Sequence, residues 1–511
     1  MLKGIILVGT SLVSFALLCL TLTCYGNQDE GRVRQPAVAG QFYPGDAQQL
    51  AGAIDAYLDD AVAPQGKRPV ALIAPHAGYI YSGQIAADAY KQASTHEYEL
   101  IVILGTNHTQ PSFDGVSFYD GVGYRTPLGL AEIDRRTTAT LMKAEPEFTF
   151  KPAVHQSEHS VEVQIPFIQT LFPDVKIVAA VVGSSKPDLA ARLGRSLAEV
   201  LSGRKALVVA SSDLSHYPKA NDAFMTDGEV LRAIASLDPE AVESTAKEQM
   251  RLGRPGLSTC ACGMGPILVA IDVAKRLDAK AAHVISYAHS GDAAVGSPDR
   301  VVGYGAVVFT PGAAVSDVSA LQPPEAAGPQ ADLTSADKQA MLTLARETIH
   351  RYLTTETTPL ARGYSPTLNR KQGAFVTLKK WGELRGCIGH MTEDRPLCQV
   401  IGAMALQAAF NDRRFQPLRW SEWGDIEIEI SVLTPFEKVA SPEAIVVGQD
   451  GVLIKKSGQS AVFLPQVATE QGWDREEMLN HLCRKAGLPQ NAWQENTEFY
   501  TFQAEVFHEN Q

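Results

Sequence analysis

The sequence predicts two domains of different class, an α/β domain over residues 31–310 and an α+β domain over residues 336–508. In the first half, short apolar runs alternate with helical stretches, which is typical of a layered α/β sheet. The second half contains a hairpin pattern and a strand of alternating apolar and polar residues, which is typical of an antiparallel sheet. Between the two, residues 311–335 are rich in Ala, Pro, Ser and Gly and lack aromatic residues, as expected of a flexible linker.

Composition limits the function classes. A chain of 511 residues is long for one compact core, and its 45% hydrophobic and 20% charged residues are ordinary for a globular protein. The net charge of −12 argues against nucleic-acid binding and favours small-molecule or protein partners. The seven cysteines are scattered and do not form the pattern of a disulfide scaffold.

The first 30 residues differ from the rest. After Lys3 comes the uncharged apolar run "GIILVGTSLVSFALLCLTLTCYG", followed by the polar stretch "NQDEGRVRQ". This layout predicts an export signal or a single membrane anchor, so residues 1–30 are excluded from the fold. The protein is expected to be exported or to meet a membrane only through this segment. If the start codon is misassigned, a cytoplasmic location is expected instead.

The elements of the first domain follow from its apolar periodicity. Strands are predicted at Val70–Ala74, Leu100–Leu104, Ile177–Val182, Ala206–Ala210 and Val301–Phe309. Helices are predicted at Gln48–Asp59, Gly83–Gln92, Ser160–Leu171, Pro187–Leu201, Gly228–Ser236 and Ile267–Lys275. If the strands are parallel, their carboxyl ends share one edge of the sheet, where open α/β sheets usually place their chemistry.

Titratable side chains follow three of the predicted strands. His76 ends the run "IAPH", His108 follows "ELIVILGTN", and Asp213 and His216 lie in "KALVVASSDLSHY". Loops held open by Pro and Gly at strand ends often carry function. If a serine of "SSDLSH" begins a helix, Asp213 and His216 are three positions apart and share one helical face.

Two further loops carry metal-capable residues. "STCACGMGPI" contains Cys260 and Cys262 before a Gly-rich turn, and "HQSEHSVEVQIPF" contains His155 and His159 before an amphipathic helix. The two cysteines are too close for an easy unstrained disulfide, so a ligand role for one of them is expected. Taken singly, a loop His is more often solvated and a Cys more often a small buried residue. Taken together, the residues of these loops favour a functional site at the edge of the sheet.

The chemistry of such a site follows from its donors. Two imidazoles and one thiolate form a soft ligand set that favours iron(II), copper(I) or zinc over magnesium or calcium. Asp213, His216 and His159 would then orient ligands or move protons.

Six ordered motifs, "AVAGQFYPGDAQQL", "APHAGYIYSG", "LGTNH", "EHSVEVQIPF", "SSDLSHY" and "CGMGPI", together resemble the Memo family across residues 33–310. The fold of that family is similar to that of class III extradiol dioxygenases, which are non-haem iron enzymes. The resemblance implies a metal held by His76, His108 and Cys262, with Asp213 and His216 lining the pocket. Iron(II) or copper is the expected ion, with zinc as an alternative.

The resemblance does not establish a reaction, because one fold hosts many chemistries. The expected function is a metal-binding, dioxygenase-like oxidoreductase acting on an unidentified small molecule. The alternatives are a non-catalytic iron- or copper-binding module, for which Cys260 would offer an extra soft ligand, and an assembly scaffold.

The second domain has its own pattern. Helices are predicted at Ala336–Leu353, Leu397–Ala409 and Arg475–Ala486, and strands at Ala374–Leu378, Leu384–Ile388 and Ile426–Val432. In the last of these strands the apolar residues alternate with Glu427, Glu429 and Ser431, which predicts one buried face.

The motifs "LRGCIG", "NDRRF" and "IEISVLTP" resemble the AMMECR family over roughly residues 336–508. The role of that family is unknown. A candidate binding patch is formed by Arg385, Cys387, His390, Arg413 and Arg414. In the alternative, Cys387 is buried filler and Arg385 pairs with Glu427 or Glu429. The fusion looks like the prokaryotic AmmeMemoRadiSam grouping, which implies a radical SAM protein as a partner.

Overall fold

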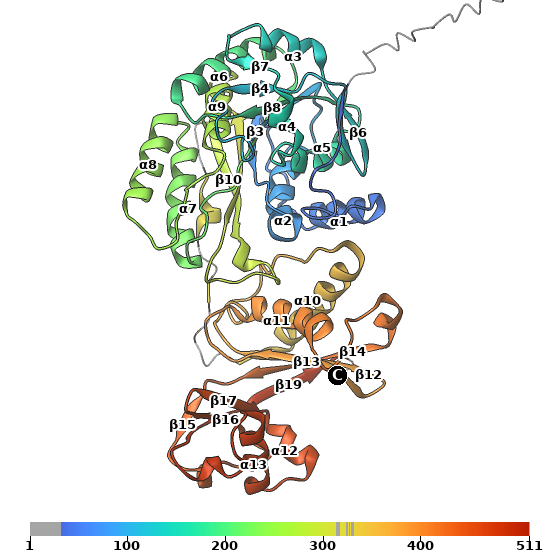
Figure 1. The fold of residues 1–511 in the computed structure, drawn as a ribbon, viewed down its shortest axis with the longest axis vertical. Coiled ribbons are helices and arrows are strands. Elements are labelled where there is room, and N and C mark those ends of the chain that lie inside the picture. Colours follow the sequence, from blue (N-terminus) through green and yellow to red (C-terminus); the bar gives the residue numbers. More distant parts are fainter. Residues whose placement is uncertain (1–31, 313–316, 323–324, 327, 329–331, 510–511) are drawn as a thin grey trace, which may run out of the picture.

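The computed structural model describes residues 32–312, 317–322, 325–326, 328 and 332–509. The predicted export signal or anchor lies outside these residues. Figure 1 shows an α/β domain above an α+β domain, which confirms the two predicted fold classes. No helix of the described part is long and apolar enough to cross a membrane.

An eight-stranded sheet with the order β10-β11-β2-β9-β3-β8-β4-β7 forms the centre of the first domain. Its strands are β2 (Ala71–Ala74), β3 (Leu100–Thr106), β4 (Val116–Phe118), β7 (Phe148–Thr149), β8 (Lys176–Val182), β9 (Ala206–Ser211), β10 (Ala279–His289) and β11 (Gly303–Pro311). The neighbours β2, β9, β3 and β8 are parallel, so their carboxyl ends meet at one edge. This confirms the predicted strands and, for these four, their shared rim; β11 is antiparallel to β2, and β4, β7 and β10 were not predicted.

Both faces of this sheet are buried, which explains why its strands are continuous apolar runs. In β3, Leu100, Val102 and Leu104 point into one core, and Ile101 and Ile103 point into the other. The first core is covered by α3 (Arg135–Met142), α6 (Pro187–Leu201), α7 (Ala220–Ala235), α8 (Pro239–Arg251) and α9 (Met264–Arg276). The second is covered by α1 (Ala47–Asp59), α2 (Tyr79–Lys91), α4 (Pro152–Gln156) and α5 (Ile165–Leu171).

A small sheet of three strands adds to the second core. Its order is β1-β5-β6, with β1 (Val33–Arg34), β5 (Gly123–Thr126) and β6 (Gly129–Glu132). Arg34 of β1 is buried against Glu162, which lies in the short 3-10 helix η1 (Glu162–Gln164). The carboxylate of Glu162 also accepts hydrogen bonds from the Tyr43 hydroxyl and the backbone N–H of Val38. These contacts fix the segment of residues 34–43 over the edge of the large sheet.

The second domain combines helices with two antiparallel sheets. One sheet has the order β13-β12-β14-β19, with β12 (Ala374–Lys380), β13 (Glu383–His390), β14 (Ile426–Leu433) and β19 (Ala504–His508). The other has the order β15-β18-β16-β17, with β15 (Glu437–Val439), β16 (Gly451–Lys456), β17 (Gln459–Phe463) and β18 (Glu498–Phe502). The helices are α10 (Ser335–Thr355), α11 (Leu397–Leu406), α12 (Pro465–Gln471) and α13 (Arg475–Lys485). The predicted hairpin and the one-sided strand β14 are confirmed.

Specific polar contacts join the two domains where α10 packs against α1. The Arg362 guanidinium makes two bonds to the Asp88 carboxylate, at 2.5 and 2.9 Å, and a third to the Asp60 carbonyl. Asp88 is fully buried in α2. Arg351 of α10 also pairs with the Asp60 carboxylate at 2.7 Å. A buried carboxylate of the first domain is thus neutralised by a residue of the second.

Candidate metal centre

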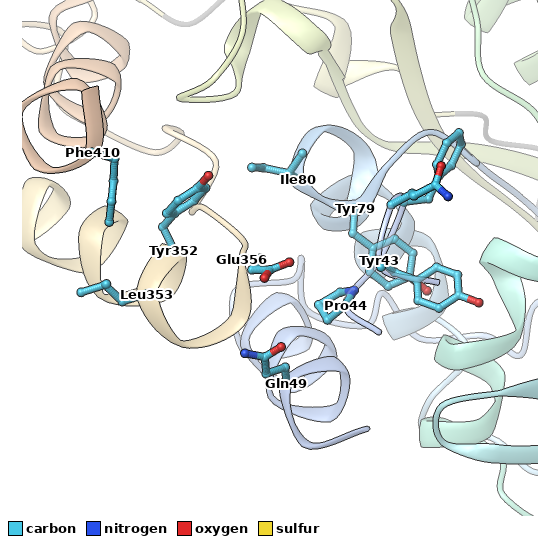
Figure 2. Close-up of a pocket in the computed structure, with 12 residues that line it drawn as sticks. Tyr43, Pro44, Gln49, Tyr79, Ile80, Tyr352, Leu353, Glu356 and Phe410 are labelled. Carbon is cyan, nitrogen blue, oxygen red and sulfur yellow. The ribbon is translucent and has the colours of Figure 1, made fainter. Parts of the chain in front are cut away.

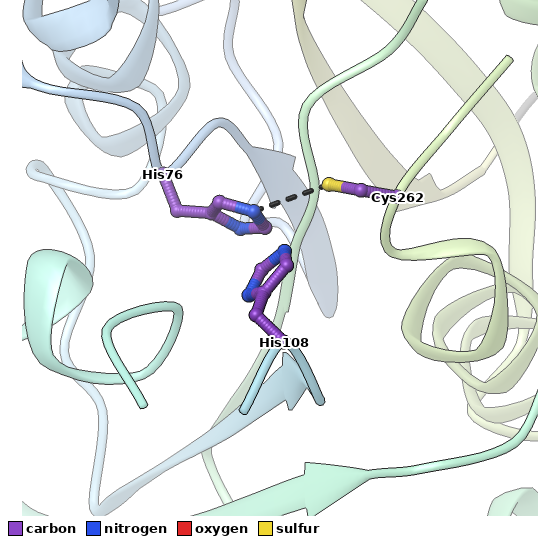
Figure 3. Close-up of side chains that lie close together, drawn as sticks. All are labelled: His76, His108 and Cys262. Atoms are coloured by element: carbon purple, nitrogen blue, oxygen red, sulfur yellow. Dashed lines mark hydrogen bonds between the residues drawn. The ribbon is translucent and has the colours of Figure 1, made fainter. Parts of the chain in front are cut away.

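Three predicted ligands meet at the carboxyl edge of the large sheet. His76 follows β2, His108 follows β3, and Cys262 lies just before α9; Figure 3 shows the three side chains converging. The His76 Nε2 atom lies 3.1 Å from the Cys262 Sγ atom. One ligand atom from each of the three residues lies within 4.8 Å of the others.

The donor set fits a single ion. Ligand bonds of about 2.0–2.3 Å place neighbouring donors around a tetrahedral ion roughly 3–4 Å apart, and the 3.1 Å between the His76 Nε2 and the Cys262 Sγ falls in this range. Burial, together with the neighbouring His108 and His159, lowers the pKa of His76, which keeps the imidazole neutral as a ligand must be. Burial and the nearby Asp213 raise the pKa of the Cys262 thiol, and a bound cation would displace that proton. These residues therefore suit a soft or borderline metal ion.

The tautomer of His76 is set by its other ring nitrogen. Its Nδ1 atom lies 3.0 Å from the Ser211 Oγ, whose own proton goes to the Ser160 carbonyl at 2.6 Å. Ser211 therefore accepts from Nδ1–H, and it also accepts from the Gln164 amide. The Nε2 lone pair is left free and directed at Cys262, as a metal ligand requires.

A buried carboxylate orients His108. Glu158 is 1% exposed, and its carboxylate lies 2.9 Å from the His108 Nδ1 and accepts the His108 backbone N–H at 2.6 Å. Burial alone would raise the pKa of Glu158, but the hydrogen bond and charge of His108 lower it to about 2. Burial lowers the pKa of His108, and Glu158 more than reverses this. Glu158 was not predicted from the sequence, although a carboxylate directly before His159 is a signal for a carboxylate–histidine pair.

The prediction that Asp213 and His216 share a helical face is wrong. Residues 212–219 form an irregular loop rather than a helix, because their backbone groups bond to distant segments. The Leu214 N–H donates to the Gly303 carbonyl at 2.8 Å, and the His216 N–H donates to the Thr259 carbonyl at 3.1 Å. These bonds replace the local ones that a helix would need.

Asp213 and His216 nevertheless reach the same site, where each offers a ligand atom within 4.8 Å of Cys262. The Asp213 Oδ1 accepts the backbone N–H of His76 at 2.8 Å, and burial raises the pKa of this carboxyl. The His216 Nδ1 donates to the Leu214 carbonyl at 3.0 Å, so its Nε2 carries the lone pair. An acid and a base thus border the three donors.

His159 lies beside the donors. Its ring stacks on that of His108 with a centroid distance of 4.6 Å and lies at 5.5 Å from that of His76. Burial lowers its pKa, which favours a neutral ring. The His159 ring also contacts Phe42, edge to face, at 4.8 Å.

Two other candidates lie away from the centre. His155 is buried between the Ser117 and Tyr124 hydroxyls, at 2.9 and 2.8 Å, and burial lowers its pKa to about 3. The Cys260 Sγ is directed at the Ala246 carbonyl at 3.6 Å. The expectation that Cys260 would supply an extra soft ligand is therefore wrong.

The candidate patch of the second domain is only partly assembled: Arg414 donates to the Cys387 carbonyl at 3.1 Å, while Arg385 and His390 pair elsewhere. Arg385 pairs with Glu422 at 3.0 Å, and not with Glu427 or Glu429 as the alternative expected. Glu429 instead pairs with Lys379. His390 pairs with Asp394, Arg414 pairs with Asp412, and Arg413 is exposed.

The "LRGCIG" motif has a packing explanation. Cys387 is half-buried, accepts the Thr377 hydroxyl, and burial raises the pKa of its thiol, so no activated nucleophile results. A Cβ on Gly386 would lie 2.2 Å from the Ala408 carbonyl, in the π-helical turn that follows α11. A Cβ on Gly389 would lie 2.2 Å from the Phe375 ring. The two glycines therefore allow the strand to pack tightly against its neighbours.

Comparisons with known proteins agree with these two halves. The profile of the family described as "Memo-like protein" matches residues 34–308, and that of "AMMECR1" matches residues 342–507. The chain is 38% identical over 283 residues to a MEMO1 family protein of Aquifex aeolicus, covering 54% of this chain and 99% of that protein. It is 36% identical over 290 residues to a MEMO1 family protein of Ignicoccus hospitalis, covering 54% and 98%.

One solved structure, an uncharacterised protein of Pyrococcus horikoshii, is 39% identical to this chain, with coverage of 34% of this chain and 90% of that chain and a TM-score of 0.33. The family profile spans more than half of this chain, and the two relatives are covered almost whole. The chain therefore belongs to the Memo-like protein family and carries an AMMECR1 domain after its Memo-like domain.

Proposed function

We propose that the chain is a metal-dependent oxidoreductase, similar to class III extradiol dioxygenases, whose ion is held by His76, His108 and Cys262. The convergence of these donors with an acid and a base beside them is the observation that supports the proposal. The soft donor set favours iron(II) or copper, with zinc as an alternative. When bound, iron or copper would supply electron-transfer chemistry that no side chain of the centre supplies.

The chain's own residues would position the substrate and move protons. His216 has its Nε2 lone pair free, so it would accept a proton from an acidic group of the substrate. Asp213, whose carboxyl has a raised pKa, would hold or return a proton at its second oxygen while its first accepts from His76. The neutral His159 ring would border the substrate on the side of His108.

A metal-binding module without turnover is the second candidate, and the cysteine ligand favours it because a thiolate bound to the ion suits copper(I) storage. The two candidates differ in what they require of His216. A carrier needs no base, so a His216→Gln variant of a carrier would load and release metal unchanged.

The test uses the full chain purified without oxygen. Metal content is measured first, and oxygen uptake is then measured with a panel of catechols. We expect His216→Gln to keep its metal and to lose about 10²–10⁴-fold in uptake rate, as is typical for loss of a general base. Stoichiometric metal without uptake on any substrate would favour the carrier.

We also propose a radical SAM protein as a partner and an exported or membrane-anchored location, both from the sequence analysis. Co-purification from the native cells tests the first, and cell fractionation tests the second. Full-length protein in the soluble cytoplasm would overturn the predicted location.

A further inference from the structure

A cavity of about 380 Å³ lies between the two domains, separate from the three metal donors. Figure 2 shows its two walls: Pro44 and Ile80 belong to the Memo-like domain, and Tyr352 and Phe410 belong to the AMMECR1 domain. Neither domain encloses it alone. Its volume lies within the range of small-molecule sites, which is about 300–1,000 Å³.

The walls are held in place by the contacts between the domains. Arg351 of α10 lies one residue before Tyr352, and its guanidinium pairs with the Asp60 carboxylate and contacts the Ala56 carbonyl. Arg362 pairs with the buried Asp88 a few residues further along the chain. Two ion pairs, one from α10 and one from the segment after it, therefore hold this side of the cavity against α1 and α2.

The lining is aromatic with one charge. The rings of Tyr352 and Phe410 lie 4.8 Å apart, and among the residues that line the cavity Glu356 is the sole ionisable carboxylate, with no Lys or Arg beside it. The hydroxyls of the lining residues Tyr43 and Tyr79 donate hydrogen bonds to the Glu162 carboxylate and to the Val163 carbonyl, which do not line the cavity.

Glu356 is placed by the end of α10. It adopts the left-handed conformation, with φ of 56°, as the residue that terminates the helix. In Figure 2 its carboxylate lies between Tyr352 and Pro44, and within the described part of the chain it makes no hydrogen bond or ion pair. Glu356 is exposed, so its carboxylate is free to pair with the positive charge of a flat ligand that packs on the aromatic lining.

The cavity is connected to the metal centre through one side chain. Phe42 lines the cavity, and its ring contacts His159 at 4.8 Å. His159 in turn stacks on His108 at 4.6 Å. A ligand in the cavity would lie one aromatic ring away from a residue of the centre.

We propose that this cavity binds a planar aromatic cation, such as an aromatic amine or amidine, and that Glu356 recognises its charge. The AMMECR1 domain then has a defined task, which is to supply half of a binding site. That this ligand is the substrate of the metal centre rests on the proposed function; the binding itself does not.

The test is a fluorescence titration of the metal-free full chain with p-aminobenzamidine, a planar aromatic cation. We expect a Kd of about 1 mM or tighter, and at least a tenfold loss, or about 1.4 kcal/mol, in Glu356→Gln. Glu470→Gln, which changes an exposed carboxylate of α12 outside the cavity, should bind like the wild type. The anionic isostere p-aminobenzoate should bind poorly to the wild type and better to Glu356→Lys.

Absence of p-aminobenzamidine binding to the wild type would overturn the proposal, as would equal affinity in Glu356→Gln or equal binding of p-aminobenzoate. Because the protein is metal-free in this titration, failure of the metal site leaves the result unaffected. The link to the centre is tested on cobalt(II)-loaded protein, whose absorption spectrum should shift with p-aminobenzamidine in the wild type and not in Glu356→Gln. Intact binding without a spectral shift would separate the cavity from the metal centre.

Discussion

The carboxylate of Asp213 accepts the backbone N–H of His76 at 2.8 Å, and so joins the loop after β9 to the loop after β2. The backbone carbonyl of Asp213 accepts the N–H of Cys262 at 3.3 Å. One residue therefore aligns two of the three metal donors, while its second carboxylate oxygen remains available to a substrate.

This arrangement separates a structural role of Asp213 from a proton-transfer role. In Asp213→Asn the amide oxygen can still accept the His76 N–H, so we expect metal content to stay at the wild-type level. The carboxyl proton is lost, so oxygen uptake should fall about 10²–10⁴-fold. Parallel loss of metal and uptake would instead assign Asp213 to holding the loops together.

Glu158 should tune the affinity of the centre. Glu158→Gln keeps an acceptor for the His108 Nδ1–H but removes the charge, so we expect metal affinity to fall about 10- to 100-fold. Competition with a chelator of known affinity measures the change. Unchanged affinity would show that His108 does not depend on its carboxylate partner, and would weaken its assignment as a ligand.

The domain interface should contribute to stability through Asp88. Arg362→Met leaves a buried carboxylate without its counter-charge, and breaking a buried pair typically costs about 3–5 kcal/mol. Arg362 keeps 31% of its side chain exposed, so we expect a loss at or below the lower end of this range, about 2–3 kcal/mol, in the free energy of unfolding. Denaturant unfolding of the full chain measures it.

The double variant Arg362→Met with Asp88→Asn is the control for that experiment. It removes the uncompensated charge, so it should recover most of the lost stability. If both variants unfold at the wild-type denaturant concentration, the ion pair does not stabilise the interface.

Asp227 should make stability depend on pH. Its carboxylate accepts from the Ser215 N–H and the Tyr287 hydroxyl, yet burial raises the pKa of Asp227 to about 7. The folded state keeps the proton while the unfolded state releases it near pH 4. The contribution of the protonated Asp227 to the free energy of unfolding is therefore fully present below about pH 4 and is lost as the pH rises to about 7. At about 1.4 kcal/mol per pKa unit, this loss is about 4 kcal/mol.

Asp227→Asn mimics the protonated acid and has nothing to titrate. Measured by denaturant unfolding from pH 4 to pH 8, the stability of the variant should rise relative to that of the wild type by up to about 4 kcal/mol. Parallel curves for the two proteins would contradict the raised pKa.

The sequence predicts the parts of the centre that depend on local patterns. The apolar runs of β2, β3 and β9 are buried on both faces, so their strand ends and the loops carrying His76 and His108 could be located. The segment around Asp213 could not, because its backbone partners come from residues 259 and 303. Glu158 was missed because its role depends on a residue 50 positions away.

In the second domain, too, local patterns could be predicted but contacts between distant residues could not. The alternation in β14 predicted its buried face, but the pairing of Arg385 was wrong because Glu422 lies outside the strand, in a short 3-10 helix. The cavity between the domains was also beyond prediction. Its walls join Phe42 to Tyr352, residues that no local pattern connects.

The central claim is that Cys262 holds a metal ion, and the chain provides a matched control two residues away. Cys260 is a buried cysteine whose thiol is directed away from the centre. The decisive measurement is the metal content of the full chain, purified without oxygen, for the wild type, Cys262→Ala and Cys260→Ala. We expect about one equivalent in the wild type and in Cys260→Ala, and well below one in Cys262→Ala. Equal metal content in all three proteins, or none in the wild type after addition of iron, copper and zinc, would contradict the account.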